Sequence, residues 1–253
     1  MENRLLSKVP EITIFFWIIK IMATTVGETG ADFLSTTLNL GLIYTSYVMW
    51  ALLIVSLILQ IVQKKYIPAF YWVTVFFMSI VGTLVTDNMI DNLGISLEMS
   101  TAIFSGALTL TFIGWYMSEK TLSIHSIHTV KREIFYWLAI LFTFALGTAS
   151  GDLFWEGLKL WYLYSWLIFA GVIGVITFSF YYLKLNAVLA FWIAYILTRP
   201  LWASFGDLLS QAPADGWMWL WTVSTSVIFT TTIVVLVIYM TLREKRILSV
   251  SKV

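Results

Sequence analysis

The sequence contains no cysteine, which excludes disulfide bonds, thiolate catalysis and cysteine-ligated metal sites. Charge is also scarce: charged residues make up 11% of the 253 residues, and no long hydrophilic segment could form a separate soluble domain. Both histidines, His125 and His128, lie outside the apolar segments, so those segments contain no Ser–His pair and no histidine metal motif. A net charge near +1 does not indicate nucleic acid as a partner.

Apolar residues are what the chain has in excess. Hydrophobic residues make up 60% of it and aromatic residues 17%. A soluble domain of this length could not bury so much apolar surface, so the expected partner is the lipid bilayer and the protein is predicted to be a multi-pass membrane protein. Eight segments are long enough to cross a hydrocarbon core of ~30 Å as helices, which satisfy their backbone hydrogen bonds internally. They run over residues 11–34, 39–62, 68–91, 98–118, 132–154, 161–183, 186–209 and 217–241.

One motif recurs four times along the chain. An aromatic residue precedes a Trp, an Asp follows that Trp by 15 residues, and in three copies a Gly stands ten residues after the Trp. The copies are Phe16-Trp17…Gly27…Asp32, Tyr71-Trp72…Gly82…Asp87, Tyr136-Trp137…Gly147…Asp152 and Phe191-Trp192…Trp202…Asp207. Successive motif Trp residues are 55, 65 and 55 residues apart. This nearly fixed period predicts an internally repeated architecture, with a ten-residue insertion in the middle.

The repeat and the apolar segments together predict an all-α polytopic membrane protein with eight transmembrane helices. The helices form four tandem helical hairpins in two pseudo-symmetric halves, within a single transmembrane domain that covers residues 1–253. The repeats run over approximately 10–64, 65–118, 130–184 and 185–245, and residues 119–129 form a cytoplasmic linker between the halves. Because each repeat crosses the membrane twice, the first, third, fifth and seventh helices (the odd helices) all point the same way.

Basic residues are distributed unevenly between the two sides of this arrangement. Lys159 is the one basic residue of the connections on the Asp side. Twelve lie on the Trp side, at the termini or in the connections that lead into odd helices: Arg4, Lys8, Lys64, Lys65, Lys120, Lys131, Arg132, Lys184, Arg243, Lys245, Arg246 and Lys252. Basic residues accumulate in cytoplasmic loops. Both termini are therefore predicted to be cytoplasmic in a cell membrane, with the Asp end of each odd helix outside.

The repeat also makes predictions about packing. The motif Trp residues are interpreted as an aromatic belt at the inner interface, and Lys20, one turn past the first Trp, is expected to extend toward that interface. Small residues stand 34 positions after each Trp, at Ala51, Gly106, Gly171 and Ser226. They predict a close contact within a hairpin or between repeats. The alternative is that they line a gap for a substrate.

Carboxylates gather in the outer half of the predicted bundle. Each motif Asp lies about 22 Å along its helix from the Trp, at a rise of ~1.5 Å per residue. With companions four residues away on the same helical face, the set is Glu28, Asp32, Asp87, Asp91, Asp152, Glu156 and Asp207. Like charges a few Å apart cannot all stay ionised unless a cation or protons bind, and ionisable groups in a membrane are functional candidates. We therefore predict an outward-facing acidic site for a cation or for protons.

Two interpretations of the motif Asp residues stay open at this point. If the side chains converge, Asp32, Asp87, Asp152 and Asp207 are candidate ligands for a divalent or monovalent cation such as Mg²⁺, Ca²⁺, Mn²⁺ or Na⁺, which take hard oxygen ligands. No other cofactor is indicated. Alternatively, each Asp caps the turn that follows its helix by accepting hydrogen bonds from free backbone N–H groups.

Arg199 is the basic residue nearest the middle of a predicted helix. It precedes Pro200, which removes one backbone hydrogen bond, so the seventh helix is expected to kink or break there. A broken helix beside a buried charge is typical of transporter binding sites. Arg199 is therefore included in the candidate site, as a partner for a carboxylate such as Glu28. The alternative is an ion pair that fixes the packing of the repeats.

The four Trp/Gly/Asp hairpins resemble a family of bacterial membrane proteins built from four tandem two-helix repeats, each with a characteristic Trp. The resemblance covers about residues 10 to 245 and implies a bacterial inner-membrane location. The fourth copy departs from the pattern, because Trp202 replaces the Gly and follows Arg199-Pro200. Members of the family are described as predicted membrane-anchored proteins of unknown function, so the resemblance implies a fold and no activity.

Three functions remain in consideration. The acidic set favours a membrane transporter or ion-conducting protein for a small cation or a cation-coupled solute, in keeping with the parallel repeats of known transporters. The first alternative is a non-catalytic membrane scaffold or sensor, in which neutralising the acids changes stability but no transport or ligand response. The second is an intramembrane aspartyl-type enzyme, which needs two close carboxylates. No catalytic residue is assigned.

Overall fold

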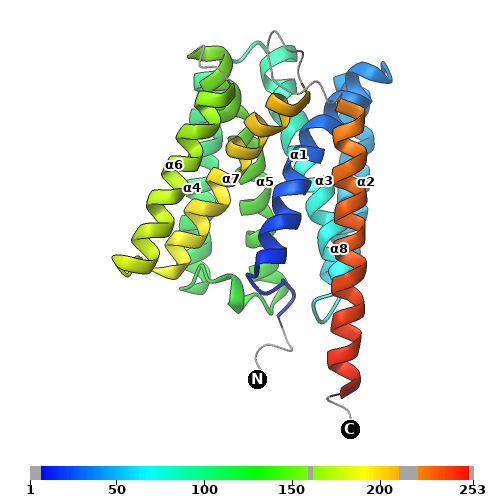
Figure 1. Cartoon of the computed structure of the whole chain (residues 1–253), viewed down its shortest axis with the longest axis vertical. Coiled ribbons are helices and arrows are strands. Elements are labelled where there is room, and N and C mark those ends of the chain that lie inside the picture. The colour runs from blue at the N-terminus through cyan, green and yellow to red at the C-terminus, as the bar shows by residue number, and fades with distance from the viewer. Residues whose placement is uncertain (1–6, 159–161, 211–221, 251–253) are drawn as a thin grey trace.

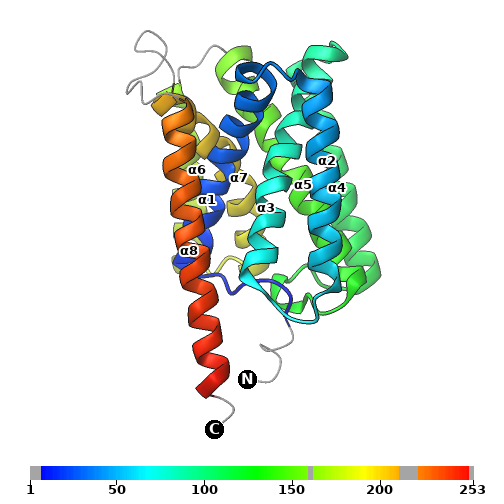
Figure 2. The ribbon, with the colours of Figure 1, turned by 90° about the vertical axis from the view of Figure 1, so that its right-hand side faces the viewer.

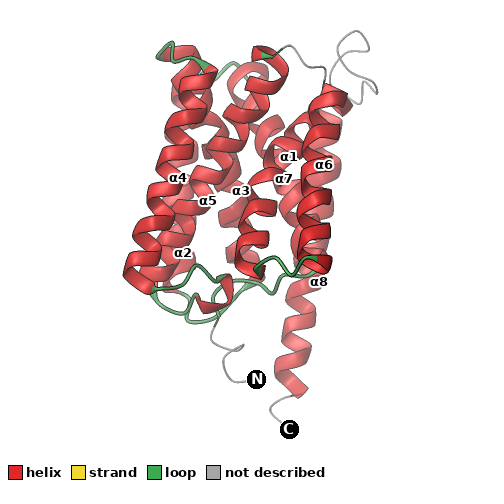
Figure 3. Ribbon diagram, turned by 90° about the vertical axis from the view of Figure 1, so that its left-hand side faces the viewer, coloured by secondary structure: helices red, strands yellow, loops and turns green. Residues whose placement is uncertain are grey.

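The computed structural model describes residues 7–158, 162–210 and 222–250. These residues form eight α-helices, and all eight are long and apolar enough to cross a membrane. Figure 3 shows that helices dominate the described part of the chain. The helices are α1 (Ile14–Asp32), α2 (Leu42–Val62), α3 (Pro68–Asp87), α4 (Leu97–Glu119), α5 (Val130–Asp152), α6 (Tyr162–Tyr182), α7 (Ala187–Ser210) and α8 (Thr222–Val250). The predicted all-α class and the number of membrane helices are confirmed.

The four odd helices form a ring in the middle of the molecule. Helix α1 contacts α3, α3 contacts α5, α5 contacts α7, and α7 returns to contact α1. In Figure 1 these helices lie between α4 and α6 on one side and α2 and α8 on the other. Of the most apolar stretch of each odd helix, 56% to 67% is buried, compared with 6% to 22% for the even helices. The even helices therefore form an outer layer whose apolar surface faces the bilayer.

The two helices of one repeat do not pack closely on each other. Each even helix makes its main contact with the odd helix of the next repeat: α2 with α3, α4 with α5, α6 with α7, and α8 with α1. Figure 2 shows α8 alongside α1, with its C-terminal turns extending beyond the rest of the bundle. Each repeat is therefore stabilised by its neighbours, as in other repeat proteins.

Three of the four small residues of the even helices do not mark a helix contact, contrary to the prediction. Ala51 is exposed, and a Cβ added to Gly106 or Gly171 would meet no heavy atom within 4 Å. Of the four, Ser226 alone reaches the ring, with a hydrogen bond of 2.6 Å between its hydroxyl and that of Thr29. The prediction holds for Ser226 and is wrong for Ala51, Gly106 and Gly171, because an equivalent position in the sequence does not determine which face of an outer helix turns inward.

Close approach occurs instead at the motif glycines of the ring. Each of the three glycines touches the residue that stands seven positions after the Trp of the next odd helix. The pairs are Gly27 with Ser79, Gly82 with Phe144, and Gly147 with Arg199. A Cβ on Gly82, for example, would lie 2.5 Å from Phe144 Cβ. Small residues let membrane helices come this close where apolar burial provides little driving force.

Local signals place the beginnings of the odd helices. The side chains of Thr13 and Thr129 accept hydrogen bonds of 3.4 and 3.3 Å from backbone N–H groups three residues later, which is the usual N-cap geometry. Asn186 caps α7 in a similar way, accepting from the backbone N–H of Val188 at 2.9 Å. Helix α3 begins with Pro68, whose missing N–H costs nothing at a first helical position.

Three odd helices end in the same way. Helices α1, α3 and α5 each stop at the motif Asp, and the chain continues as one turn of π-helix. These turns are η2 (Phe33–Thr37), η3 (Asn88–Asn92) and η5 (Leu153–Gly157). After the first two turns, Gly41 and Gly94 take positive φ angles of 74° and 66°, which glycine adopts without steric cost. Because π-helical turns are rare and frequently lie at functional sites, this end of the ring is where a site is expected.

The motif Trp residues do not form an exposed belt, which corrects the prediction. Trp72, Trp137 and Trp192 are buried, and Trp17 is half-buried. The ring of Trp137 lies 5.4 Å from that of Tyr71 on the neighbouring helix, measured between centroids. The indoles therefore fill the space between adjacent odd helices, and burial against protein rather than the interface explains their regular spacing.

The linker between the halves packs against the Trp end of the bundle. It contains a short 3₁₀ turn, η4 (Ile124–Ser126), and Ile124 and Ile127 are buried. The Ile127 carbonyl accepts a hydrogen bond of 3.1 Å from the backbone N–H of Lys8. The linker and the segment before α1 thus cover the same end of the ring.

Candidate functional site

A column of side chains runs along each odd helix with a spacing of four residues. Residues four apart lie on one helical face, and each column starts at the aromatic residue before the motif Trp and ends at the motif Asp. The columns are Phe16, Lys20, Thr24, Glu28 and Asp32 on α1; Tyr71, Val75, Ser79, Thr83 and Asp87 on α3; Tyr136, Ile140, Phe144, Thr148 and Asp152 on α5; and, on α7, Phe191, Tyr195, Arg199 and Ala203 as far as side chains are described. The column of α1 is buried as far as Thr24, and its first accessible side chains are Glu28 and Asp32. Access to these columns is therefore from the Asp end.

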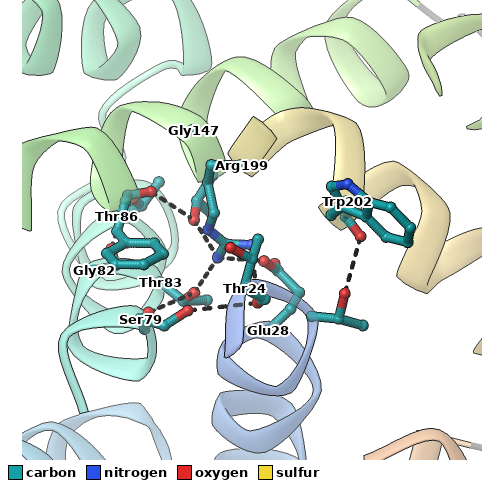
Figure 4. A network of polar contacts seen from close by, with 12 residues as sticks. Thr24, Glu28, Ser79, Gly82, Thr83, Thr86, Gly147, Arg199 and Trp202 are labelled. Atoms are coloured by element: carbon teal, nitrogen blue, oxygen red, sulfur yellow. Dashed lines mark hydrogen bonds and ion pairs between the residues drawn. The ribbon is translucent and has the colours of Figure 1, made fainter. Parts of the chain in front are cut away.

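Arg199 lies midway along α7 and binds to all three other odd helices. Its Nη2 is 2.5 Å from Glu28 Oε2 on α1 and donates hydrogen bonds to Thr83 Oγ1 on α3 (2.5 Å) and Thr148 Oγ1 on α5 (2.9 Å). Its Nη1 donates to the Thr24 carbonyl at 3.4 Å. Figure 4 shows the Arg199 guanidinium close to Thr24, Glu28 and Thr83. The side chain is fully buried. One guanidinium, midway along α7, therefore links all four odd helices.

The two threonines around Arg199 are oriented as acceptors by their own helices. Thr83 donates its hydroxyl hydrogen to the Ser79 carbonyl, and Thr148 donates to the Phe144 carbonyl, each at 3.2 Å. Their oxygen lone pairs are then available to the guanidinium. The predicted pairing of Arg199 with Glu28 is confirmed, whereas the threonines were missed because Thr is common in these helices and gives no distinguishing signal.

Helix α7 is continuous through Pro200, so of the predicted kink or break the break is absent, and the kink stays a prediction. Gly147 and Gly151 of α5 face the proline, and a Cβ on either would lie within 4 Å of it. The space left by these glycines accommodates the proline ring against the neighbouring helix. The position of Arg199 therefore depends on a packed helix and not on an unwound one.

Glu28 connects Arg199 to the motif carboxylates. Electrostatic repulsion acts between Glu28 and both Asp32 and Asp87, and Arg199 attracts both of these Asp residues. The structure thus brings one carboxylate of the predicted acidic set, Glu28, into contact with Arg199, and Asp32 and Asp87 lie within electrostatic range of that pair. Like charges held near one another in a membrane are costly unless a cation or a proton compensates them.

The remaining carboxylates of the predicted set lie farther toward the Asp end. Asp91 and Glu156 are exposed and repel each other, and Asp91 also repels Asp87. Asp152 is half-buried at the end of α5. The side chain of Asp207 lies outside the described residues, so the equivalence of all four motif Asp residues stays a prediction.

Three of the four motif Asp residues do not cap the π-helical turns that follow them. Asp32, Asp87 and Asp152 each precede a π-helical turn, and none of the three makes a capping hydrogen bond from its side chain. Capping of the π-helical turn is therefore wrong for these three, and capping of the helix that follows stays a prediction. Within residues 7–158, 162–210 and 222–250, no group of three or more His, Asp or Glu side chains is placed to hold a metal ion. The predicted metal site includes Asp207, whose side chain lies outside the described residues, so that site stays a prediction.

Lys20 is buried close to Arg199, so the prediction that it extends toward the interface is wrong. Its Nζ donates hydrogen bonds to the Tyr195 carbonyl (3.0 Å) and to the Thr198 hydroxyl, and it lies 4.5 Å from the centroid of the Tyr195 ring. Among the described residues no carboxylate lies within ion-pair distance of it. Neutral oxygens and a ring face therefore solvate this amine.

On the Trp side of Lys20, buried aromatic side chains fill the space between the four odd helices. This aromatic layer consists of Phe16, Tyr71, Tyr136, Phe191 and Tyr195, each with 6% or less of its surface exposed. The hydroxyl oxygens of Tyr71 and Tyr136 are 2.5 Å apart and share a hydrogen bond. The layer separates the polar part of the columns from the Trp end.

A second buried ion pair lies beyond the aromatic layer. Lys8 Nζ is 2.7 Å from Glu133 Oε2 and donates to the Ile61 carbonyl at 2.8 Å. Gln60 Nε2 donates to Glu133 Oε1 at 3.1 Å. This Lys8 cluster (Lys8, Gln60 and Glu133) is buried and joins the segment before α1 to α2 and α5.

Sequence reasoning missed the Lys8 cluster and the hydroxyl groups of the aromatic layer. Lys8 was counted with the cytoplasmic basic residues, although Glu133 stands among the basic residues of that side and is a signal for a partner. The aromatic residue before each Trp is Tyr in the two middle copies, Tyr71 and Tyr136, and this difference from Phe indicated a polar role.

Comparison with known proteins identifies the repeat but no characterised relative. A model described as "Repeat of Unknown Function (DUF347)" matches residues 15–66, 70–121 and 190–246, which together are more than half of the chain. Each matched segment contains one odd helix and the even helix that follows it, in the first, second and fourth copies of the motif. No curated protein and no solved structure matches the chain. The chain therefore belongs to the family of the Repeat of Unknown Function, DUF347.

Proposed function

We propose that this protein transports a small cation, or a solute coupled to a cation, across the membrane along the columns of the odd helices. The observation that carries the proposal is the ion pair between the buried Arg199 and the partly accessible Glu28, with Asp32 and Asp87 in electrostatic range of it. Ionisable groups inside a membrane cost free energy, and a buried ion pair is often no more stabilising than well-packed apolar residues. Their presence is better explained by a function than by folding.

The charges in this region are not balanced. Three carboxylates stand against the two basic groups, Arg199 and Lys20, and the carboxylates repel one another. A cation or a proton that enters from the Asp end would restore the balance, and the exposed Asp32 would be its first contact. A scaffold has no use for an excess of carboxylates beside a buried Arg199, so the imbalance favours transport over the scaffold or sensor.

The proposed access is from outside the cell. Lys64, Lys65 and Lys184 lie in connections at the Trp end of the described helices. Since basic residues accumulate in cytoplasmic loops, the Trp end is assigned to the cytoplasm and the Asp end to the outer surface. Both termini are then cytoplasmic.

The proposal is tested by cation flux into liposomes that contain the purified protein. Indicator dyes inside the liposomes report H⁺, Na⁺ and Mn²⁺. We expect wild type to admit at least one of these cations, and Glu28→Gln and Asp87→Asn each to reduce that flux to the level of protein-free liposomes. The reason is that each substitution removes one of the negative charges that attract the cation.

Glu98→Gln is the matched control for these two variants. Glu98 is an exposed carboxylate in the first turn of α4, in the outer layer, so its neutralisation should leave the flux at the wild-type rate. A wild-type protein that admits none of the three cations would overturn the proposal. So would Asp87→Asn and Glu28→Gln variants as active as Glu98→Gln.

A further inference from the structure

One nitrogen of the Arg199 guanidinium occupies a point where oxygens from three helices meet. Its Nη2 lies 2.5 Å from Glu28 Oε2 on α1, 2.5 Å from Thr83 Oγ1 on α3 and 2.9 Å from Thr148 Oγ1 on α5. This point, the Nη2 position, is formed by the packing of the ring and not by one local turn. Carboxylate and hydroxyl oxygens are hard ligands of the kind that metal cations of the main groups prefer.

The two hydroxyl oxygens keep their orientation when Arg199 is not there. Thr83 and Thr148 donate their hydroxyl hydrogens to the Ser79 and Phe144 carbonyls of their own helices, each at 3.2 Å. The direction of their lone pairs is therefore set by α3 and α5. A cation other than the guanidinium would meet the same two acceptors at the Nη2 position.

The fit of Arg199 to its surroundings is incomplete. Its Nε is buried without a hydrogen-bond partner among the described residues, and so is the Oε2 atom of Glu28, although it lies in ion-pair contact with Nη2. Nη1 reaches the Thr24 carbonyl at 3.4 Å, beyond the usual range of about 2.7–3.2 Å. Buried polar groups with unmade hydrogen bonds cost free energy. The guanidinium therefore leaves part of the bonding capacity of this site unused.

The charge and number of the oxygens at the Nη2 position favour a monovalent cation. One carboxylate and two hydroxyls carry a single negative charge, which one positive charge balances. Mg²⁺ binds oxygens at about 2.0–2.1 Å and Ca²⁺ takes about six to eight of them, and this site matches neither requirement. Glu28 is the accessible ligand, because 16% of its side chain is exposed compared with 1% for Arg199.

We propose that the Nη2 position, between Glu28, Thr83 and Thr148, is the binding site of an alkali-metal cation, and that Arg199 is a tethered competitor for it. This inference rests on the proposed function and names its substrate class and ligands. The guanidinium withdraws when the cation binds and returns when it leaves. Glu28 thus keeps a positive partner in both states, which avoids the cost of a buried unpaired carboxylate.

The movement that the exchange requires is confined to the end of the Arg199 side chain. A Cβ added to Gly147 would overlap Arg199 Cβ and Cγ, so this part of the side chain lies directly against α5. The stem therefore stays packed, and rotation about the bonds beyond Cγ carries the guanidinium away from the oxygens. The ring of helices does not need to open for the cation to bind.

The test measures thermal unfolding in detergent with NaCl, KCl or choline chloride at equal concentrations. Arg199→Met removes the competitor and leaves the oxygens, so NaCl or KCl should raise its unfolding midpoint by about 3 °C or more above the value in choline chloride. Wild type should respond less, because Arg199 competes with the added cation. Adding Glu28→Gln to Arg199→Met removes the charged ligand and should abolish the rise.

The hydroxyl ligands have a matched control in the outer layer. Thr83→Val/Thr148→Val, added to Arg199→Met, keeps the shape of both side chains and should abolish the rise. Thr109→Val/Thr177→Val makes the same change at exposed threonines with the same local hydrogen bond and should preserve it. Absence of a rise in Arg199→Met would overturn the site, as would a rise that survives the loss of the Glu28 carboxylate or of the two ring hydroxyls.

Flux in liposomes separates this site from the proposed function and needs no Arg199 variant. Na⁺ or K⁺ flux that Thr83→Val/Thr148→Val abolishes and Thr109→Val/Thr177→Val retains supports the site. A wild-type protein that admits H⁺ or Mn²⁺ but neither Na⁺ nor K⁺ would overturn the alkali-metal site and leave cation transport standing. The opposite result, stabilisation of Arg199→Met by Na⁺ or K⁺ through Glu28 without flux of any cation in wild type, would overturn transport and leave the binding site standing.

Discussion

The inner ring and the outer layer are built from helices of similar length and apolar composition, yet the same residue types have different roles in them. In the ring, the motif glycines Gly27 and Gly82 lie against the next helix, and an added Cβ would overlap it. In the outer layer, Gly106 and Gly171 have open space where a side chain would be. A glycine in this protein therefore marks a helix contact only when it lies on the face that turns toward the ring.

Threonine shows the same contrast. In the outer layer, Thr109 and Thr177 donate hydrogen bonds of 2.8 Å to the carbonyl four residues before them, and their side chains are exposed. In the ring, Thr83 and Thr148 make the same local bond but also accept hydrogen bonds from Arg199. The local hydrogen bond of threonine is therefore the same in the two regions. The additional hydrogen bond from the buried Arg199 distinguishes the threonines of the ring.

Within the ring, one of the four contacts differs from the others. Trp202 stands where the other odd helices have the motif Gly, and the contact between α7 and α1 is the least extensive of the four. The bulky indole cannot permit the approach that a glycine allows. The Thr25 hydroxyl still reaches the Trp202 carbonyl, at 3.4 Å, and helps to close the ring.

The largest effect is expected from replacing Arg199, the buried basic residue of the ring. Arg199→Met leaves Glu28 without its partner and removes the donors that bind Thr83 and Thr148, so stability should fall by about 3 kcal/mol. Unfolding in detergent, followed by circular dichroism, measures the loss. Arg243→Met, at an exposed site of α8, should change stability by less than about 0.5 kcal/mol.

A second variant sharpens the interpretation of Arg199. Adding Glu28→Gln to Arg199→Met removes the unpaired charge, so part of the lost stability should return, and the double-mutant cycle gives the coupling between the two residues. Additive losses would show that the pair does not contribute as a pair. If Arg199→Met were as stable as Arg243→Met, the buried charge would not distinguish the ring from the outer layer.

A smaller loss is expected at the glycine contacts of the ring. Gly27→Ala places a Cβ against Ser79, and Gly82→Ala places one against Phe144, where backbone atoms also lie nearby. Overpacking of this kind costs about 1–3 kcal/mol. The midpoint of thermal unfolding in detergent should therefore decrease for both variants. Unchanged midpoints would mean that the ring helices move apart to accommodate the added Cβ with no loss of stability.

The smallest effect is expected for the same substitution in the outer layer. Gly106→Ala and Gly171→Ala meet no neighbouring atom, and alanine favours the helix by up to about 1 kcal/mol relative to glycine. The unfolding midpoint should stay constant or rise slightly in the same assay. A decrease as large as that of Gly27→Ala would show that these glycines contact something outside the single chain.

Much of the fold and part of the site could be predicted before the structure was known. The helices and their approximate ends follow from apolar length, and the Glu28–Arg199 pair followed from two charges at similar depth in odd helices. The even helices were misjudged, because small residues at equivalent positions were assumed to face inward. The Lys8–Glu133 pair joins residues 125 positions apart, and the local sequence around Glu133 indicates a basic partner without indicating which one.

The amino-acid sequence by itself determined that this chain is a membrane protein of eight helices in four repeats, because length, hydropathy and period are local properties that a bilayer converts directly into helices. Tertiary structure alone decided that the odd helices close into a ring, that each even helix packs on the next repeat, and that Arg199, Lys20 and the tyrosines meet near its axis. These contacts depend on which face each helix turns toward its neighbours. That choice is made by packing between distant segments, where one glycine or one tryptophan changes how closely two helices approach.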